Sequence, residues 1–189
     1  MKKIDLLPVL LMAVISLQSC NSNSNSSDTV ESAQEINDDK ENLNENVSEF
    51  MVKAANGGMM EVQLGEMAQQ NAMSQSVKNF GSMLVKDHGA ANEELKTLAS
   101  AKNITLPAAV GDDLQQHIID LTQLKGREFD EKYMAMMVDD HQKDIDLYED
   151  AADSEDSDLK AFAAKTLPVL KMHLDSAKAI NDRLKKTNN

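Results

Sequence analysis

The sequence has few of the residues that build β-sheets or disulfide-bonded folds. It has no Trp, aromatic residues make up 3% of its 189 residues, and it has a single Cys. Gly and Pro are also scarce, at 7 and 3 residues, whereas Met reaches 12. Strands favour aromatic and β-branched residues, whereas Leu, Met and Ala favour helices. The composition therefore predicts an all-α protein.

Positive charge and long apolar runs are also in short supply. The 19 Lys and Arg residues are outnumbered by 32 Asp and Glu residues, which gives a formal net charge of −13. Binding to nucleic acid and adsorption to anionic lipid both need clustered basic residues, so the charge argues against both. No stretch after residue 20 is apolar over the roughly 20 residues that span a bilayer. An acidic surface mainly confers solubility, although it also attracts cations.

The N-terminal residues have the pattern of an export signal. Lys2 and Lys3 precede an apolar segment at 6–17 that is too short to span a membrane. The segment Leu17-Gln18-Ser19-Cys20 follows at once and resembles the lipobox of bacterial lipoproteins. We therefore expect residues 1–19 to be a lipoprotein signal peptide. The alternative is an ordinary signal peptide followed by a stray thiol.

The lipobox resemblance implies that Cys20 carries a lipid that holds the protein at a membrane of the cell envelope. Residue 21 is Asn and not the Asp that marks inner-membrane retention in some bacteria, so we expect the outer membrane. Residues 20–45 are mostly Asn, Ser, Asp and Glu with little apolar content. Such a segment cannot offset the entropy of ordering, which predicts a flexible polar tether.

The remaining residues, 46–187, have the pattern of a four-helix bundle. Apolar residues recur at steps of three and four in four segments, which lie at about 48–72, 75–101, 129–153 and 158–185. Ser48 and Ser157 are candidate N-caps. The connection at 102–128 is long and carries its own short helix near 112–124. One long crossover between the second and third helices is the ferritin-like arrangement of a four-helix bundle.

Each apolar stripe is interrupted once, near mid-helix, by a good metal ligand. The four residues are Glu61, His88, His141 and His173. Mid-helix positions lie at similar heights whichever way a helix runs, so we expect the four side chains to meet in one layer. Three imidazoles and a carboxylate suit a divalent transition metal such as Zn, Fe or Cu. Asp144, one turn after His141, can add a ligand or accept a hydrogen bond from a histidine.

Two other functions stay open. In one, the Glu and His layer is a metal-free hydrogen-bond network in a structural or interaction module. In the other, an open coordination position makes the protein a metalloenzyme. The sequence has no nucleophile triad, no Gly-rich phosphate loop and no haem-attachment motif, which favours binding over catalysis. His117 has no counterpart on the other helices, so we treat it as incidental. Asp87 and Asp140 are expected to face solvent or a helix edge.

Several short motifs occur together in a characteristic order. They are Phe50-x3-Ala54, Glu61-Val62, Val77-x2-Phe80-x2-Met83, Asp87-His88, Ile104-x-Leu106-Pro107, Phe129-Asp130-x2-Tyr133, His141 and Leu167-Pro168-x4-His173. Over about residues 46–185 the chain resembles domain-of-unknown-function family 4142. The resemblance implies a ferritin-like fold and an exported or outer-membrane protein, but no activity. Ferritin-like di-iron proteins carry Glu-x-x-His motifs. Here Val85, Val138 and Leu170 replace the Glu, which favours at most a mononuclear site.

Overall fold

The computed structural model describes residues 28–186, so the leader, Cys20 and the start of the expected tether lie outside the described residues. All six regular elements of this range are helices, which confirms the all-α prediction. Their bounds are α1 Thr29–Asp38, α2 Glu45–Asn71, α3 Gln75–Ala101, α4 Asp112–Thr122, α5 Gly126–Ala152 and α6 Ser157–Lys186. Within residues 28–186, no helix has the length and apolar character to cross a membrane.

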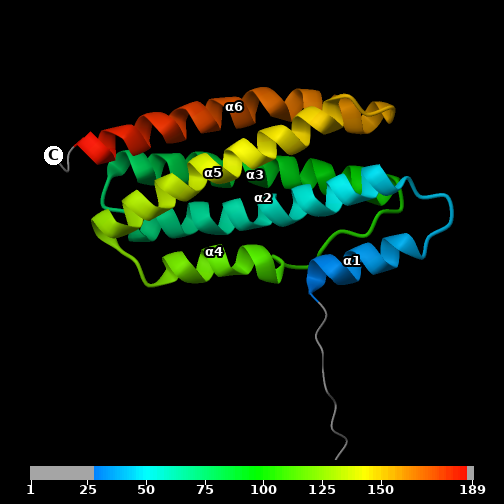
Figure 1. Cartoon of the computed structure of the whole chain (residues 1–189), viewed down its shortest axis with the longest axis horizontal. Helices are drawn as coiled ribbons and strands as arrows, with labels where there is room; N and C mark the ends of the chain where they lie inside the picture. The colour runs from blue at the N-terminus through cyan, green and yellow to red at the C-terminus, as the bar shows by residue number, and fades with distance from the viewer. Residues whose placement is uncertain (1–27, 187–189) are drawn as a thin grey trace, which may run out of the picture.

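The four long helices form a bundle of two antiparallel hairpins (Figure 1). One hairpin is α2 with α3, the other is α5 with α6, and α2 also packs on α5 and α3 on α6. The connection from α3 to α5 runs along one side of the bundle from one end to the other and contains α4 (Figure 1). This is the ferritin-like connectivity that the sequence predicts.

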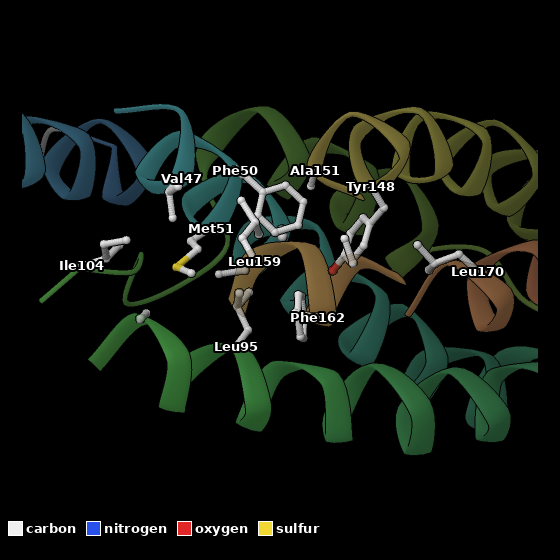
Figure 2. Close-up of a cluster of buried hydrophobic side chains, with 14 of the residues drawn as sticks. Val47, Phe50, Met51, Leu95, Ile104, Tyr148, Ala151, Leu159, Phe162 and Leu170 are labelled. Atoms are coloured by element: carbon white, nitrogen blue, oxygen red, sulfur yellow. The ribbon is translucent and has the colours of Figure 1, made fainter. Parts of the chain in front are cut away.

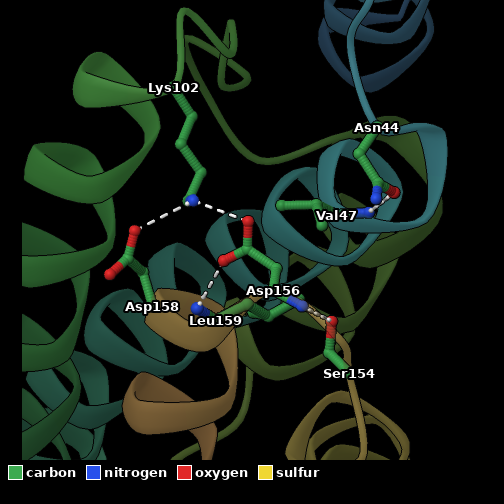
Figure 3. Close-up of polar contacts among 7 residues, drawn as sticks. All are labelled: Asn44, Val47, Lys102, Ser154, Asp156, Asp158 and Leu159. Atoms are coloured by element: carbon green, nitrogen blue, oxygen red, sulfur yellow. Dashed lines mark hydrogen bonds and ion pairs between the residues drawn. The ribbon is translucent and has the colours of Figure 1, made fainter.

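The helix caps differ from those predicted. The side chain of Asn44 accepts a hydrogen bond from Val47 N at 3.2 Å, so α2 begins before Ser48, which is buried inside the helix. Asp156 accepts a hydrogen bond from Leu159 N at 2.9 Å, directly before the first residue of α6, Ser157 (Figure 3). Asn and Asp cap helices as well as Ser does, so neighbouring candidates in the sequence compete.

Polar contacts join the two hairpins at each end of the bundle. At one end, the buried carboxylate of Asp130 in α5 accepts hydrogen bonds from Met73 N and Ser74 N in the α2–α3 turn, at 3.1 and 2.8 Å. At the other end, Lys102 Nζ lies 2.7 Å from Asp156 Oδ2 and joins the end of α3 to the start of α6 (Figure 3). These contacts set the heights of the four helices relative to one another.

The expected tether is wrong at residues 29–38, which form helix α1. The helix packs on α2, and its first residues lie near the start of α4 (Figure 1). Asn37, which is buried, donates to Thr105 O at 2.8 Å and accepts from Thr105 N at 2.7 Å. Asp28 accepts from Val30 N and from Asp112 N, both at 2.7 Å. Side-chain to backbone hydrogen bonds hold this segment, and a count of apolar residues does not detect them.

Close contact between α2 and α3 depends on two glycines. A Cβ atom on Gly81 would lie 2.6 Å from the carbonyl oxygen of Gly65, and one on Gly65 would lie 2.6 Å from the carbonyl oxygen of Gly81. Any side chain at either position would push the two backbones apart. The adjacent pair Gly57 and Gly58 also lies on α2. Only Gly58 has a close neighbour, since its Cβ would lie 2.2 Å from Asn92 Oδ1.

The apolar interior consists of two clusters. One cluster is centred on Phe50, which packs edge-on against Tyr148 and Phe162 with ring centroids 5.0 and 6.4 Å apart (Figure 2). The other contains Phe129 and Tyr133, whose rings stack at 5.3 Å. Each long helix contributes residues to both clusters. His88 and His141 lie between the two sets of positions, whereas Glu61 and His173 lie at the boundary, next to Met60 and Leu174.

Candidate metal centre

Three histidines from three helices meet in the interior. They are His88 of α3, His141 of α5 and His173 of α6. Their ring centroids lie 5.3 to 5.6 Å apart, and one ring nitrogen from each lies within 4.8 Å of the other two. The exposed fractions are 7% for His88 and 0% for the other two. The structure thus brings together all three predicted histidines, and this cluster could hold a metal ion.

One nitrogen of each ring faces outward to an acceptor. Nδ1 of His88 lies 2.9 Å from Oε2 of Glu61. Nδ1 of His141 lies 2.9 Å from the carbonyl oxygen of Met137, one turn earlier in α5. Nε2 of His173 lies 3.1 Å from Oδ2 of Asp87. The Met137 carbonyl can only accept, and a carboxyl accepts when it is ionised, so with Glu61 ionised each of these outer nitrogens is assigned the ring proton.

The other nitrogen of each ring faces inward and has no hydrogen-bond partner among residues 28–186. These atoms are His88 Nε2, His141 Nε2 and His173 Nδ1. With the ring protons on the outer nitrogens, all three carry lone pairs. A buried polar atom without a partner costs about 1–3 kcal/mol. Three lone pairs that share one small buried space therefore leave a site that a cation would stabilise.

The surroundings keep the imidazoles neutral. Burial, reinforced by the charges of His88 and His173, lowers the pKa of His141 to about 3. Burial, followed by the charge of His88, lowers the pKa of His173 to about 4. Burial also lowers the pKa of His88, although Asp144 and Asp87 oppose the shift. Metals bind the neutral form of imidazole, so at neutral pH no ring proton competes with a metal ion.

Glu61, the predicted fourth ligand, lies behind the histidines. It contacts two outward-facing nitrogens, at 2.9 Å to His88 Nδ1 and 3.4 Å to His141 Nδ1. Its carboxyl is thus placed to orient two rings, and it supplies negative charge when it is ionised. Asp144, which we expected beside a histidine, lies beside Glu61 instead, and the charge of Glu61 helps to raise the pKa of Asp144 after burial.

Sequence reasoning missed two of the three groups that orient the rings. Asp87 does reach a neighbouring helix, but its contact there is His173 of the metal cluster. The carbonyl of Met137 is a backbone group, so no side-chain pattern could point to it. Asp87 follows the packing of α3 on α6. It directly precedes His88, and its side chain is only 25% exposed because it faces α6.

The donor set fits a transition metal. Zinc binds imidazole nitrogen at about 2.0–2.1 Å, which places three nitrogens about 3.4 Å from one another in a tetrahedral site. In the structure the three ring nitrogens lie within 4.8 Å of one another. A movement of each ring by at most about 1 Å would bring them to the spacing of a zinc site. Three nitrogen ligands leave a fourth position for water or another small ligand. Phe80 lies against two of the rings, with centroids 6.1 Å from His141 and 6.4 Å from His173.

The carboxyl of Glu61 should make the metal-free protein less stable as the pH rises from 7 to 9. Burial, reinforced by the charge of Asp140, raises the pKa of Glu61 from 4.5 to about 8. A raised folded-state pKa gives stability that is complete below the unfolded pKa and is lost as the pH rises through 8. The free energy of unfolding should therefore fall by about 1.4 kcal/mol over this range because of Glu61.

Urea unfolding at pH 7 and pH 9 measures this effect. The cluster histidines are neutral in the folded protein but about one quarter protonated in the unfolded chain at pH 7, so they oppose the fall by a few tenths of a kcal/mol. Glu61→Gln should make the fall smaller, whereas Glu66→Gln, an exposed position on the same helix, should leave it unchanged. Equal pH dependence in the wild type and in Glu61→Gln would contradict the role assigned to this carboxyl.

Comparisons with known proteins place the chain in a family. The family model described as "Domain of unknown function (DUF4142)" matches residues 30–180, which include α1 as well as the four long helices. No curated protein and no solved structure gives a match. The matched range contains all three histidines of the cluster and Glu61. The chain belongs to the DUF4142 family, as its sequence motifs indicate.

Proposed function

We propose that the protein binds one divalent transition-metal ion through His88, His141 and His173. The observation that carries the proposal is the set of three inward-facing imidazole nitrogens without hydrogen-bond partners in the described part of the chain. Imidazole suits Zn, Fe and Cu, and the choice among these metals is open. Glu61 and Asp87 would orient two of the rings and offset the charge of the ion.

The alternative, a metal-free polar layer, is less well supported. Such a layer must satisfy its buried polar atoms with one another. With Glu61 ionised, the outer nitrogens meet acceptors and the inner nitrogens have no hydrogen-bond partner in the described part of the chain. A hydrogen-bond network would require a donor at the centre of the cluster. A cation removes that requirement, because one ion binds all three lone pairs.

We favour metal binding, buffering or redox protection over catalysis. A hollow of about 510 Å³ lies between the start of α2 and the end of α5, and its lining includes Asn44, Lys53 and Ser154 but none of the three histidines. The histidines lie in the interior, where two are fully buried. A buried ion with one further coordination position can be held or can exchange electrons without a substrate pocket beside it.

Metal removal tests the proposal. The purified full chain should contain about one transition-metal ion, and a chelator should lower its thermal midpoint. Metal that binds only the folded state adds about 2.7 kcal/mol of stability at a free concentration one hundred times Kd. Elemental analysis and thermal unfolding, with Zn, Fe and Cu added back in turn, measure both quantities. A protein that contains no metal and is indifferent to all three ions would contradict the proposal.

We also propose that the protein is anchored in the cell envelope, more specifically at the outer membrane, by a lipid on Cys20. The support is the lipobox-like segment at 17–20 directly after an apolar stretch. Cys20→Ser should prevent lipid attachment and leave the protein unprocessed or in the soluble fraction. Fractionation and the mass of the product measure this. A Cys20→Ser protein that is processed normally and stays in the membrane fraction would contradict the anchor.

A further inference from the structure

Two further buried polar atoms without hydrogen-bond partners in the described part of the chain lie outside the histidine cluster. His117, on α4, faces Asp140, on α5, with 3.7 Å between Nδ1 and Oδ2. That separation is too long for a hydrogen bond, and neither atom has a hydrogen-bond partner within residues 28–186. Asp140 is only 6% exposed, whereas the side chain of His117 is 30% exposed. The pair therefore has one residue in the interior, on α5, and one partly exposed residue on α4.

The geometry of this pair suits two ligands of one ion. A nitrogen and an oxygen that each bind a metal at about 2.0–2.2 Å lie 3 to 4 Å apart, roughly the separation observed here. The other carboxylate oxygen of Asp140 is 3.5 Å from Lys143 Nζ, and the side chain of Lys143 is 71% exposed. Lys143 can therefore swing into solvent when a cation takes its place.

Carboxyl groups connect this pair with the histidines. Asp144 lies one turn after Asp140 on α5 and neighbours Glu61, which contacts His88. A Cβ atom on Gly57, one turn before Glu61 on α2, would lie 3.6 Å from Asp144 Oδ1, so the carboxyl of Asp144 lies against α2 near Glu61. One oxygen of Glu61, Oε1, also has no hydrogen-bond partner in the described part of the chain. Three carboxyls so close together repel one another unless they are protonated or a cation lies among them.

We propose that His117 and Asp140 form an outer, weaker cation-binding position, from which a divalent metal ion reaches the three histidines along Asp144 and Glu61. This inference rests on the proposed function. It assigns a role to His117, which the sequence left incidental. It also accounts for buried carboxyls that do not themselves bind the inner ion. Charges of one sign along an entrance raise the rate at which an oppositely charged ion is captured by a factor of about 10 to 1,000.

The test is the rate of zinc uptake by the metal-free full chain, followed by stopped flow against a fluorescent zinc indicator. The variants are His117→Gln and Asp140→Asn. The matched control is Asp139→Asn, which makes the same change at the neighbouring exposed position. Both variants should take up zinc at least about tenfold more slowly than the wild type. Asp139→Asn should stay within about twofold, and every protein should end with one tightly held ion.

The outcomes separate this inference from the proposed function. Uptake by both variants within twofold of the wild-type rate would overturn the outer position and leave the histidine centre standing. Loss of the tightly held ion in His117→Gln would also overturn it, because an outer ligand should change the rate and not the final occupancy. A wild-type protein that takes up no zinc would overturn both. His117→Gln keeps the test valid if Asp140→Asn fails to fold.

Discussion

Replacing His141 by Ala should weaken zinc binding by more than about 100-fold and remove the stabilisation that the metal provides. His141 is fully buried, and one of its ring nitrogens lies within 4.8 Å of a ring nitrogen of each of the other two histidines. Loss of a residue that only orients a metal ligand costs about 10- to 100-fold in affinity, so loss of a ligand itself should cost more. Competition with a zinc chelator measures the affinity, and thermal unfolding measures the stabilisation.

The matched control for this prediction is His117→Ala, which removes the one histidine outside the cluster. The equilibrium affinity of this variant for zinc should stay within about threefold of wild type, because His117 neither binds the inner ion nor orients one of its ligands. The opposite pattern would contradict the metal centre. In that pattern, His141→Ala binds zinc as the wild type does, and its only defect is lower stability in the absence of metal. Such a result would favour the hydrogen-bonded polar layer.

Replacing Tyr133 by Ala should lower the free energy of unfolding by about 3–5 kcal/mol, the cost of removing a large buried aromatic side chain. Tyr133 is 0% exposed, stacks on Phe129 at 5.3 Å and meets Phe80 edge-on at 6.3 Å. Phe80 in turn lies against two of the cluster histidines. The variant should therefore loosen the interior beside the metal centre as well as the apolar cluster. Urea unfolding measures the loss.

Tyr133→Phe separates packing from the hydroxyl group. The hydroxyl of Tyr133 is buried without a hydrogen-bond partner among the residues that the structure describes. An unpaired buried hydroxyl costs free energy, so its removal should leave stability unchanged or raise it by about 1 kcal/mol. If Tyr133→Phe were as damaging as Tyr133→Ala, the hydroxyl would have an essential partner, and the packing argument would fail.

The bundle could be predicted because helical periodicity fixes which face of a segment is buried. The segment 75–101 was predicted with the bounds that the structure gives, and the other three long helices differ by at most three residues at either end. The meeting of His88, His141 and His173 could be predicted for the same reason. Each is one polar residue in an apolar stripe, and mid-helix residues of antiparallel helices lie at the same height.

The orientation of the rings could not be predicted from the pattern. A stripe gives the face and height of a residue, but not the side-chain torsion angles that decide which nitrogen points inward. For that reason Glu61 was expected among the ligands, whereas it contacts the outer side of His88. Asp87 was expected to face solvent or the edge of a neighbouring helix, and it does reach α6, but the pattern did not identify His173 as its partner there.

Helix α1 shows a different limit. Residues 29–38 have too few apolar residues to predict an ordered element, and only Ala33 and Asn37 are buried in the helix. What orders the segment is its hydrogen bonds to the crossover loop, as between Asn37 and Thr105. These partners are 68 residues apart in the sequence. Local composition cannot reveal such a pairing.

The central claim is that one metal ion is held by three imidazole nitrogens from α3, α5 and α6. X-ray absorption spectroscopy of the zinc-loaded full chain tests it most directly, because the scattering reports the atoms bound to the metal. We expect three imidazole ligands with Zn–N distances of about 2.0–2.1 Å, together with one further light-atom ligand. A shell of oxygen atoms without the multiple-scattering signal of imidazole would contradict the claim.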